Sequence, residues 1–346
     1  MTETTPSPQP AVSPKQRHWI HAGTGLFEIV LVMGASLAIA ILVQQNLSPS
    51  LMETLGVATG QDPDFLAASR VMGIQIAAQY GVLLGLVALV GYLRGRRRLA
   101  DYAITPPRHH KHPMAYGVAA GLIAGIVPSL VFILQDLAPI GSNTPFWEVQ
   151  ANADWDWRFW LFTGIASYGV IAIVEEMAWR GYVQGRLMEG FAPGAAILIT
   201  TLIFALLHVQ YLQADAALQL TFAGLIFGSL IFGVSTYRTG SLVPAIIAHA
   251  IINTPMSTLL HMLTLVLALA VLIVWRKQVW AEVRLWGQTF ACWSTLAALP
   301  ALLLIAGLAI AAMRLPNGLI IIPAFVALGV VGLGFWKRSA YAPARE

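Results

Sequence analysis

The feature of this sequence that most restricts its fold is a series of apolar runs, each about 20 residues long, that recurs between Gly23 and Trp336. Wound as a helix, a run of this length crosses a hydrocarbon core of roughly 30 Å. A closed barrel would instead show alternating apolar and polar residues. Only 10% of the residues are charged, against about 25% in soluble domains. We therefore predict an all-α, polytopic transmembrane helix bundle.

Ten spans are predicted, and the loops between them divide the chain into four parts. The spans cover residues 24–45, 71–93, 114–135, 158–187, 193–212, 217–236, 241–255, 257–275, 288–312 and 317–336. The four parts are a disordered cytoplasmic tail (1–20), an N-terminal three-span bundle (21–157), a four-span core (158–256) and a C-terminal three-span bundle (257–346).

Lysine and arginine predict the orientation, because these residues accumulate in cytoplasmic loops. An even number of spans puts both termini on one side of the membrane. With the termini in the cytoplasm, all but three of the 20 Lys and Arg residues are cytoplasmic, the exceptions being Arg70, Arg158 and Arg314. Topology thus accounts for the net charge of +4 without nucleic acid as a partner. We expect a multi-pass protein of the plasma (cytoplasmic) membrane.

Glycines at four-residue spacing are interpreted as packing positions rather than as part of a site. They are Gly117, Gly121 and Gly125 in one span, and Gly224 and Gly228 in another. Small residues at this spacing let two helix backbones approach closely.

Two adjacent carboxylates, Glu175 and Glu176, stand inside the fourth predicted span. Each charge in such a position costs about 2.5 to 3.5 kcal/mol on insertion scales. The cost would be small if the helix ended at the headgroups. However, the helical pattern continues to Leu187, which puts the pair about 18 Å from that end of the span. Acids at this depth indicate a functional site.

Three further polar side chains are expected at a similar depth. The fifth span places His208 about 22 Å from the cytoplasmic side. The seventh span places His249 about 12 Å and Asn253 about 18 Å deep, four residues apart on one face. One buried histidine alone could equally be structural. Four polar residues at matching depth favour a site formed by Glu175, His208, His249 and Asn253.

The two glutamates are predicted to have different roles, because neighbouring side chains on a helix point about 100° apart. Glu176 precedes Arg180 by four residues, the favourable order for an ion pair, and Arg180 would otherwise be an unpaired buried charge. Glu175 then remains as the free base. Phe204 lies one helical turn before His208 and is expected to support its ring by packing.

The segments EEMAWRG, FALLH and HAIIN resemble the motifs EExxxR, FxxxH and HxxxN. These motifs belong to the CAAX-protease and bacteriocin-processing intramembrane peptidases, which include the Rce1-type prenyl-protein endopeptidases. All three occur in order within about residues 158–256, and Gly181 follows Arg180 as in the family. The resemblance implies an endopeptidase that acts on a membrane-associated or lipidated peptide or protein.

The resemblance further implies that Glu175 with His208 activates water, while His249 and Asn253 bind the oxyanion or complete the site. Glu175, His208 and His249 could also ligate zinc, with water in the fourth position, and the family is often described as metallopeptidases on those grounds. The same side chains suffice for metal-free catalysis. We favour this second interpretation, in which no cofactor is required.

Two other functions compete with the peptidase. Buried Glu and His residues also line ion pathways, so an ion- or proton-coupled transporter is an alternative, although the sequence shows no clear inverted repeat. The other is a catalytically silent membrane scaffold or immunity protein. Intact motifs favour an enzyme over this last alternative.

Overall fold

Helices make up all the regular structure of the described residues. The computed structural model describes residues 14–54, 65–94, 99–107, 111–137, 169–208, 211, 216–253 and 258–291. Every regular element in these residues is a helix, as the apolar runs predicted.

Four helical segments are long and apolar enough to cross a membrane. They are His21–Leu47, Gly73–Leu93, Pro113–Leu134 and Gln219–Thr239. A bent pair of helices, Thr258–Val274 and Arg276–Phe290, makes up to five spans if it is counted as one. Each of these overlaps a predicted span. The count of ten and the cytoplasmic termini stay predictions, since the last predicted span and most of the ninth lie outside the described residues.

The described helices follow one another in this order along the chain: α1 (Pro14–Thr54), α2 (Phe65–Leu93), η1 (Leu99–Tyr102), α3 (Pro113–Ala124), α4 (Ile126–Leu137), α7 (Ile171–Glu176), η3 (Met177–Gln184), α8 (Gly185–Met188), α9 (Pro193–Leu206), α10 (Ala216–Thr239), α11 (Val243–Asn253), α12 (Thr258–Val274) and α13 (Arg276–Phe290).

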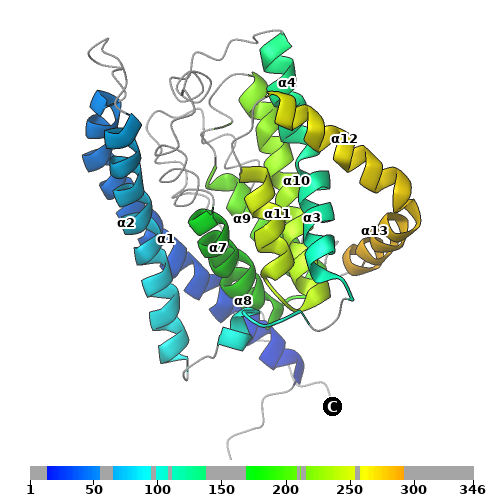
Figure 1. Cartoon of the computed structure of the whole chain (residues 1–346). Helices are drawn as coiled ribbons and strands as arrows, with labels where there is room; N and C mark the ends of the chain where they lie inside the picture. The colour runs from blue at the N-terminus through cyan, green and yellow to red at the C-terminus, as the bar shows by residue number, and fades with distance from the viewer. Residues whose placement is uncertain are drawn as a thin grey trace, which may run out of the picture.

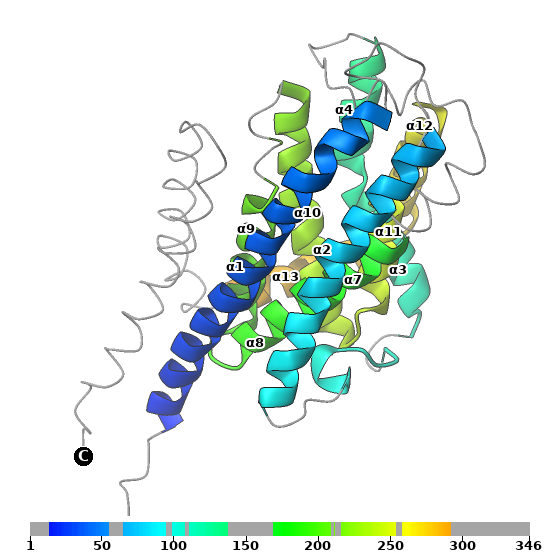
Figure 2. The ribbon, with the colours of Figure 1, turned by 90° about the vertical axis from the view of Figure 1, so that its left-hand side faces the viewer.

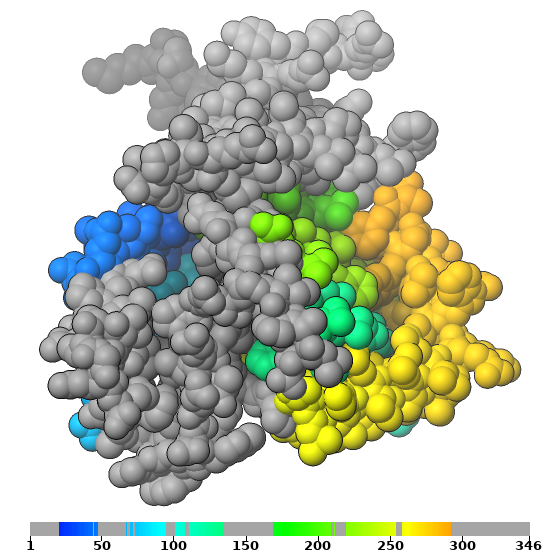
Figure 3. Space-filling model, turned by 90° about the horizontal axis from the view of Figure 1, so that it is seen from above, coloured from blue at the N-terminus to red at the C-terminus, as the bar shows by residue number. Residues whose placement is uncertain are grey.

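The segment from α7 to α8 stands between two groups of helices (Figure 1). On one side α1 and α2 pack against each other and run obliquely past the rest (Figure 2). On the other side lie α3, α10 and α11. Seen from above, α12 and α13 form the side of the molecule opposite α1 (Figure 3). The carboxylate-bearing helix is therefore central.

Close approach of α3 to α11 explains the glycines of α3. A Cβ atom at Gly117 would lie 2.9 Å from backbone atoms of Pro244, and one at Gly121 would lie 2.9 Å from Ala248 Cα. Neither backbone could accommodate it without moving. The packing interpretation is confirmed at these positions, and Gly224, whose Cβ would lie 3.0 Å from Val127, agrees with it.

A cluster of charges ties α1 and α2 to the end of α8. Glu28 of α1 lies 3.2 Å from Arg186 and 3.5 Å from Arg94. Glu189, directly after α8, pairs with both arginines at 2.7 Å. Because Arg94 directly follows α2, this cluster fixes one end of the α1–α2 pair against the central helix.

Several helix boundaries differ from the sequence prediction. α1 begins at Pro14, so it includes the end of the predicted tail, whose residues 1–13 are outside the described part. α9 ends at Leu206 rather than near residue 212. After α12 the chain bends by 85° into α13, a helix that was predicted as a loop. Its Trp and charged residues interrupt the apolar pattern on which the spans were predicted.

Candidate active site

Glu175 and Glu176 are the last two residues of α7, and both are buried. As the sequence pattern predicted, the helical backbone continues beyond this pair. It continues as a π-helix, η3, from Met177 to Gln184. Insertions of π-helical geometry are rare and often occur at functional sites. This π-helix begins directly after the two carboxylates, and Arg180 is its fourth residue.

The predicted ion pair between Glu176 and Arg180 is present. Arg180 Nη1 donates to Glu176 Oε1 at 2.8 Å, and both side chains are fully buried. Arg180 Nη2 donates to the Ser229 hydroxyl at 2.8 Å and to the Ser229 carbonyl at 3.2 Å. The guanidinium also lies 4.9 Å from the ring centre of Phe204 and 5.1 Å from that of Phe232. These contacts compensate a charge that would otherwise be very costly in the interior.

His249 connects the two glutamates. Its Nδ1 lies 2.7 Å from Glu176 Oε1, and since a carboxylate only accepts, Nδ1 carries the proton of this bond. Its Nε2 lies 3.7 Å from Glu175 Oε2. The ring stacks on Phe232, with centres 5.1 Å apart and an angle of 16° between planes. Glu176 therefore orients His249 as well as Arg180, a second contact that the spacing along one helix did not predict.

Glu175 has a partner from outside the predicted core. The hydroxyl of Tyr80, on α2, donates a hydrogen bond to Glu175 Oε1. Sequence reasoning missed Tyr80, as it did Ser229 and Phe232 on α10. The available signal was a tyrosine inside an apolar run, because a buried Tyr hydroxyl usually has a hydrogen-bond partner.

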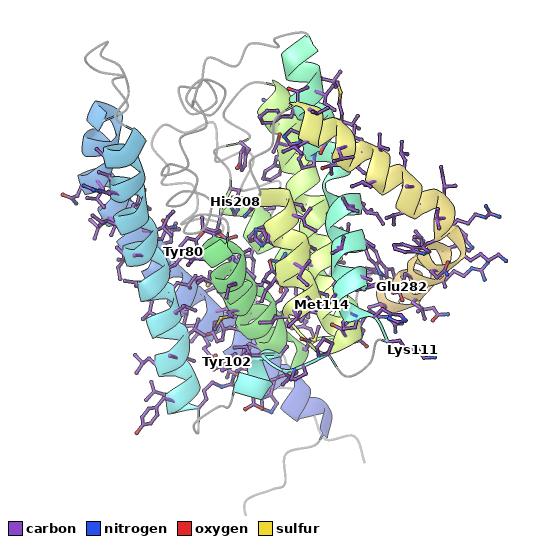
Figure 4. All side chains as sticks on the ribbon, in the orientation of Figure 1. Tyr80, Tyr102, Lys111, Met114, His208 and Glu282 are labelled. Atoms are coloured by element: carbon purple, nitrogen blue, oxygen red, sulfur yellow. The ribbon has the colours of Figure 1, made fainter. Side chains whose placement is uncertain are left out.

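His208 comes just after the end of α9, in a turn. Its Nδ1 lies 2.8 Å from the carbonyl oxygen of Phe204, so Nδ1 is the donor and Nε2 keeps a lone pair in the neutral ring. The Phe204 ring lies 4.7 Å away, as expected from their spacing, and Tyr211 stacks at 6.1 Å. In Figure 4, His208 and Tyr80 both lie near the beginning of α7.

Asn253 is not drawn into this network, and among the described residues the suggested zinc ligands are not grouped around one metal position. Asn253 is the last residue of α11, one turn after His249, and within the described residues it makes no hydrogen bond with the other site residues. In the same part of the chain, no three His, Cys, Asp or Glu side chains are arranged to hold a metal ion. The zinc set of Glu175, His208 and His249 therefore finds no support in the geometry.

The arrangement is suited to acid–base chemistry. It contains one buried carboxylate with a hydrogen-bond donor on one oxygen and an imidazole facing the other. A second carboxylate, Glu176, is neutralised by Arg180 and orients that imidazole. Such a group of side chains can accept a proton from water and stabilise a developing negative charge. The catalytic roles of the individual residues stay predictions.

Comparison with known families agrees with the motifs. Residues 156–255 match a family model described as type II CAAX prenyl endopeptidase Rce1-like. The match coincides with the segment that carries the three motifs, and it confirms their resemblance to this family. It supports a protease embedded in a membrane, while α1 to α4, α12 and α13 lie outside the matched segment. No curated protein and no solved structure was found to match the chain.

Proposed function

We propose that the protein is an intramembrane endopeptidase that hydrolyses a peptide bond of a membrane-associated or lipidated substrate, because residues 156–255 match the Rce1-like family model. The observation that carries the proposal is the buried group of Glu175, His249, Glu176 and Arg180 within the matched segment. A membrane protein maintains such a set of charges at a considerable cost.

In the proposed reaction, Nε2 of His208 holds a water molecule and Glu175 accepts a proton from it. The resulting hydroxide attacks the peptide carbonyl, and His249 with Asn253 stabilises the oxyanion of the tetrahedral intermediate. Collapse of that intermediate breaks the C–N bond, and the proton held by Glu175 passes to the leaving amine. No covalent bond to the enzyme forms.

The contacts of His249 support its assigned role. Glu176 accepts from Nδ1, which sets the orientation of the ring. Nε2 is then the atom that faces Glu175 and the reacting group. Arg180 donates to the same oxygen of Glu176 at 2.8 Å and so fixes the position of this carboxylate. Glu176 and Arg180 thus act through His249 and have no direct contact with the substrate.

We propose that this reaction needs no metal ion. The side chains of Glu175 and His208 supply a base and a nitrogen that can hold the water, so they suffice for hydrolysis without a metal. Cleavage in the presence of a strong chelator is expected to continue at the untreated rate. Loss of cleavage that is restored by Zn²⁺ would contradict this part of the proposal.

The proposal also includes the topology in its finer form, with ten spans, both termini in the cytoplasm and the plasma membrane as the location. Lys and Arg distribution supports it. Accessibility of single cysteines introduced before α1 and after residue 336 tests it. Labelling from the outer side of sealed cells at either end would refute the orientation.

Activity is tested on the purified protein in liposomes with a panel of membrane-tethered peptides. The panel includes prenylated C-termini, leader peptides and membrane-anchor segments, with products identified by mass spectrometry. Glu175→Ala is expected to abolish cleavage. Glu282→Gln, on the distant helix α13, is the matched control and keeps wild-type turnover. Undiminished turnover in Glu175→Ala would refute the peptidase, and a Glu175-dependent ion flux without products would favour the transporter.

A further inference from the structure

The hydroxyl of Tyr80 is an unusual feature of α2. Between Gly73 and Leu93 this helix has the composition of a membrane span, and only 17% of its apolar 18-residue stretch is buried inside the protein. Tyr80 lies in the middle of this segment. Its side chain turns toward α7 (Figure 4), where its hydroxyl meets Glu175.

The direction of the hydrogen bond follows from its partners. An ionised carboxylate only accepts, so the Tyr80 hydroxyl donates to Oε1 of Glu175. Hydrogen bonds to charged acceptors are about twice as strong as neutral ones. The other carboxylate oxygen, Oε2, faces His249 Nε2 at 3.7 Å. Each oxygen of Glu175 therefore has its own neighbour, and the bond from Tyr80 is the hydrogen bond that fixes the position of Oε1.

The position of α2 is set independently of this contact. Directly after α2, Arg94 pairs with Glu189 at 2.7 Å, and Val87 packs in the same hydrophobic cluster as Trp179 of η3. The helix is thus held against the central segment at its far end as well. Tyr80 reaches Glu175 from a segment that the Rce1-like match does not include.

We propose that Tyr80 is a positioning residue of the active site. Its hydroxyl holds the Glu175 carboxylate in the orientation that accepts the proton of the attacking water, so the α1–α2 pair completes the site formed by the Rce1-like segment. This inference rests on the proposed peptidase function. A hydrogen bond that served only to hold α2 against α7 would instead contribute to stability and leave turnover unchanged.

The test compares three variants for cleavage kinetics and thermal unfolding in the same liposomes. Tyr80→Phe is expected to lower kcat about 10- to 100-fold, because misplacing a reacting group by 1 Å can cost about 100-fold. KM and the unfolding temperature are expected to stay at the wild-type values. Val87→Ala, which removes packing from the same helix, is expected to lower the unfolding temperature and to leave kcat unchanged. Tyr237→Phe, on the exposed side of α10, is the control for loss of a tyrosine hydroxyl and is expected to change neither.

The outcomes separate this inference from the proposed function. Wild-type kcat in Tyr80→Phe, with cleavage abolished in Glu175→Gln, overturns the role of Tyr80 alone. A fall in kcat that is matched by Val87→Ala at equal loss of stability also overturns it, because the effect would then come from loosening α2. Wild-type cleavage by Glu175→Gln overturns the proposed function itself. A lower kcat confined to Tyr80→Phe, at unchanged KM and unfolding temperature, supports the positioning role.

Discussion

Replacing Arg180 by Met is expected to destabilise the protein more than any replacement of a surface arginine. The guanidinium donates to Glu176 and twice to Ser229, and neither side chain of the ion pair is exposed. Arg180→Met removes all three hydrogen bonds and leaves Glu176 buried with His249 as its remaining partner. Hydrogen bonds in membrane proteins average about 0.6 kcal/mol each, so the three contribute about 2 kcal/mol. Removing one partner of a buried ion pair costs about 3 to 5 kcal/mol in soluble proteins.

We therefore expect Arg180→Met to lower the free energy of unfolding by about 2 to 5 kcal/mol, measured by steric trapping or by denaturant titration in bicelles. Arg238→Met is the matched control. Its ion pair with Glu282 spans 3.5 Å, and the two side chains are 35% and 24% exposed, so its loss should cost no more than about 1 kcal/mol. Adding Glu176→Gln to Arg180→Met should recover part of the loss, because the uncompensated charge is gone. Equal effects of Arg180→Met and Arg238→Met would refute the reasoning.

Two further predictions concern glycines. Gly121→Ala places a Cβ 2.9 Å from the backbone of α11 and should lower the free energy of unfolding by about 1 to 3 kcal/mol. Gly34→Ala, where the described atoms leave open space, should leave the free energy of unfolding unchanged or raise it. Similar effects of the two variants would contradict close packing of α3 on α11. Gly181→Ala places a Cβ 2.7 Å from the carbonyl oxygen of Tyr102 and should increase hydrogen exchange in η1. Gly185→Ala, whose nearest neighbour atom lies 3.9 Å away, should not, and unaltered exchange in both variants would show that the contact is absent.

Interactions between side chains four residues apart were predictable from the sequence. The spacing of Glu176 and Arg180 predicted their ion pair, and the spacing of Phe204 and His208 predicted the contact of their rings. Both depend on a spacing of four residues, and the second contact forms although His208 stands in the turn after α9. The π-helical geometry of η3 did not prevent the first of these pairs from forming.

Contacts between helices were predictable only in outline. Matching depths brought His249 to the level of the glutamates, but depth alone did not show that its ring bridges Glu175 and Glu176. Tyr80 and Ser229 reach the site because of how α2 and α10 rotate about their axes. That rotation is set by packing against several helices, and nearly uniform apolarity around each of the two helices hides it from the sequence.

The helix ends were predictable where a residue with a special backbone marks them. Pro193 predicted the beginning of α9, since proline is favoured in the first turn. No comparable signal marks its end at Leu206, because apolar residues continue through Leu207. The expected span was therefore too long, and His208 occupies a turn rather than a helix.

Turnover of Glu175→Gln is the most direct test of the account. The substitution keeps the size of the side chain and can still accept from Tyr80, but it removes the base. Initial rates of peptide release are compared with those of the wild type in liposomes of identical composition, at saturating substrate. The account predicts a loss of kcat of at least about 100-fold, the lower end of the contribution of a general base, with an unchanged unfolding temperature. Wild-type turnover in this variant would contradict it.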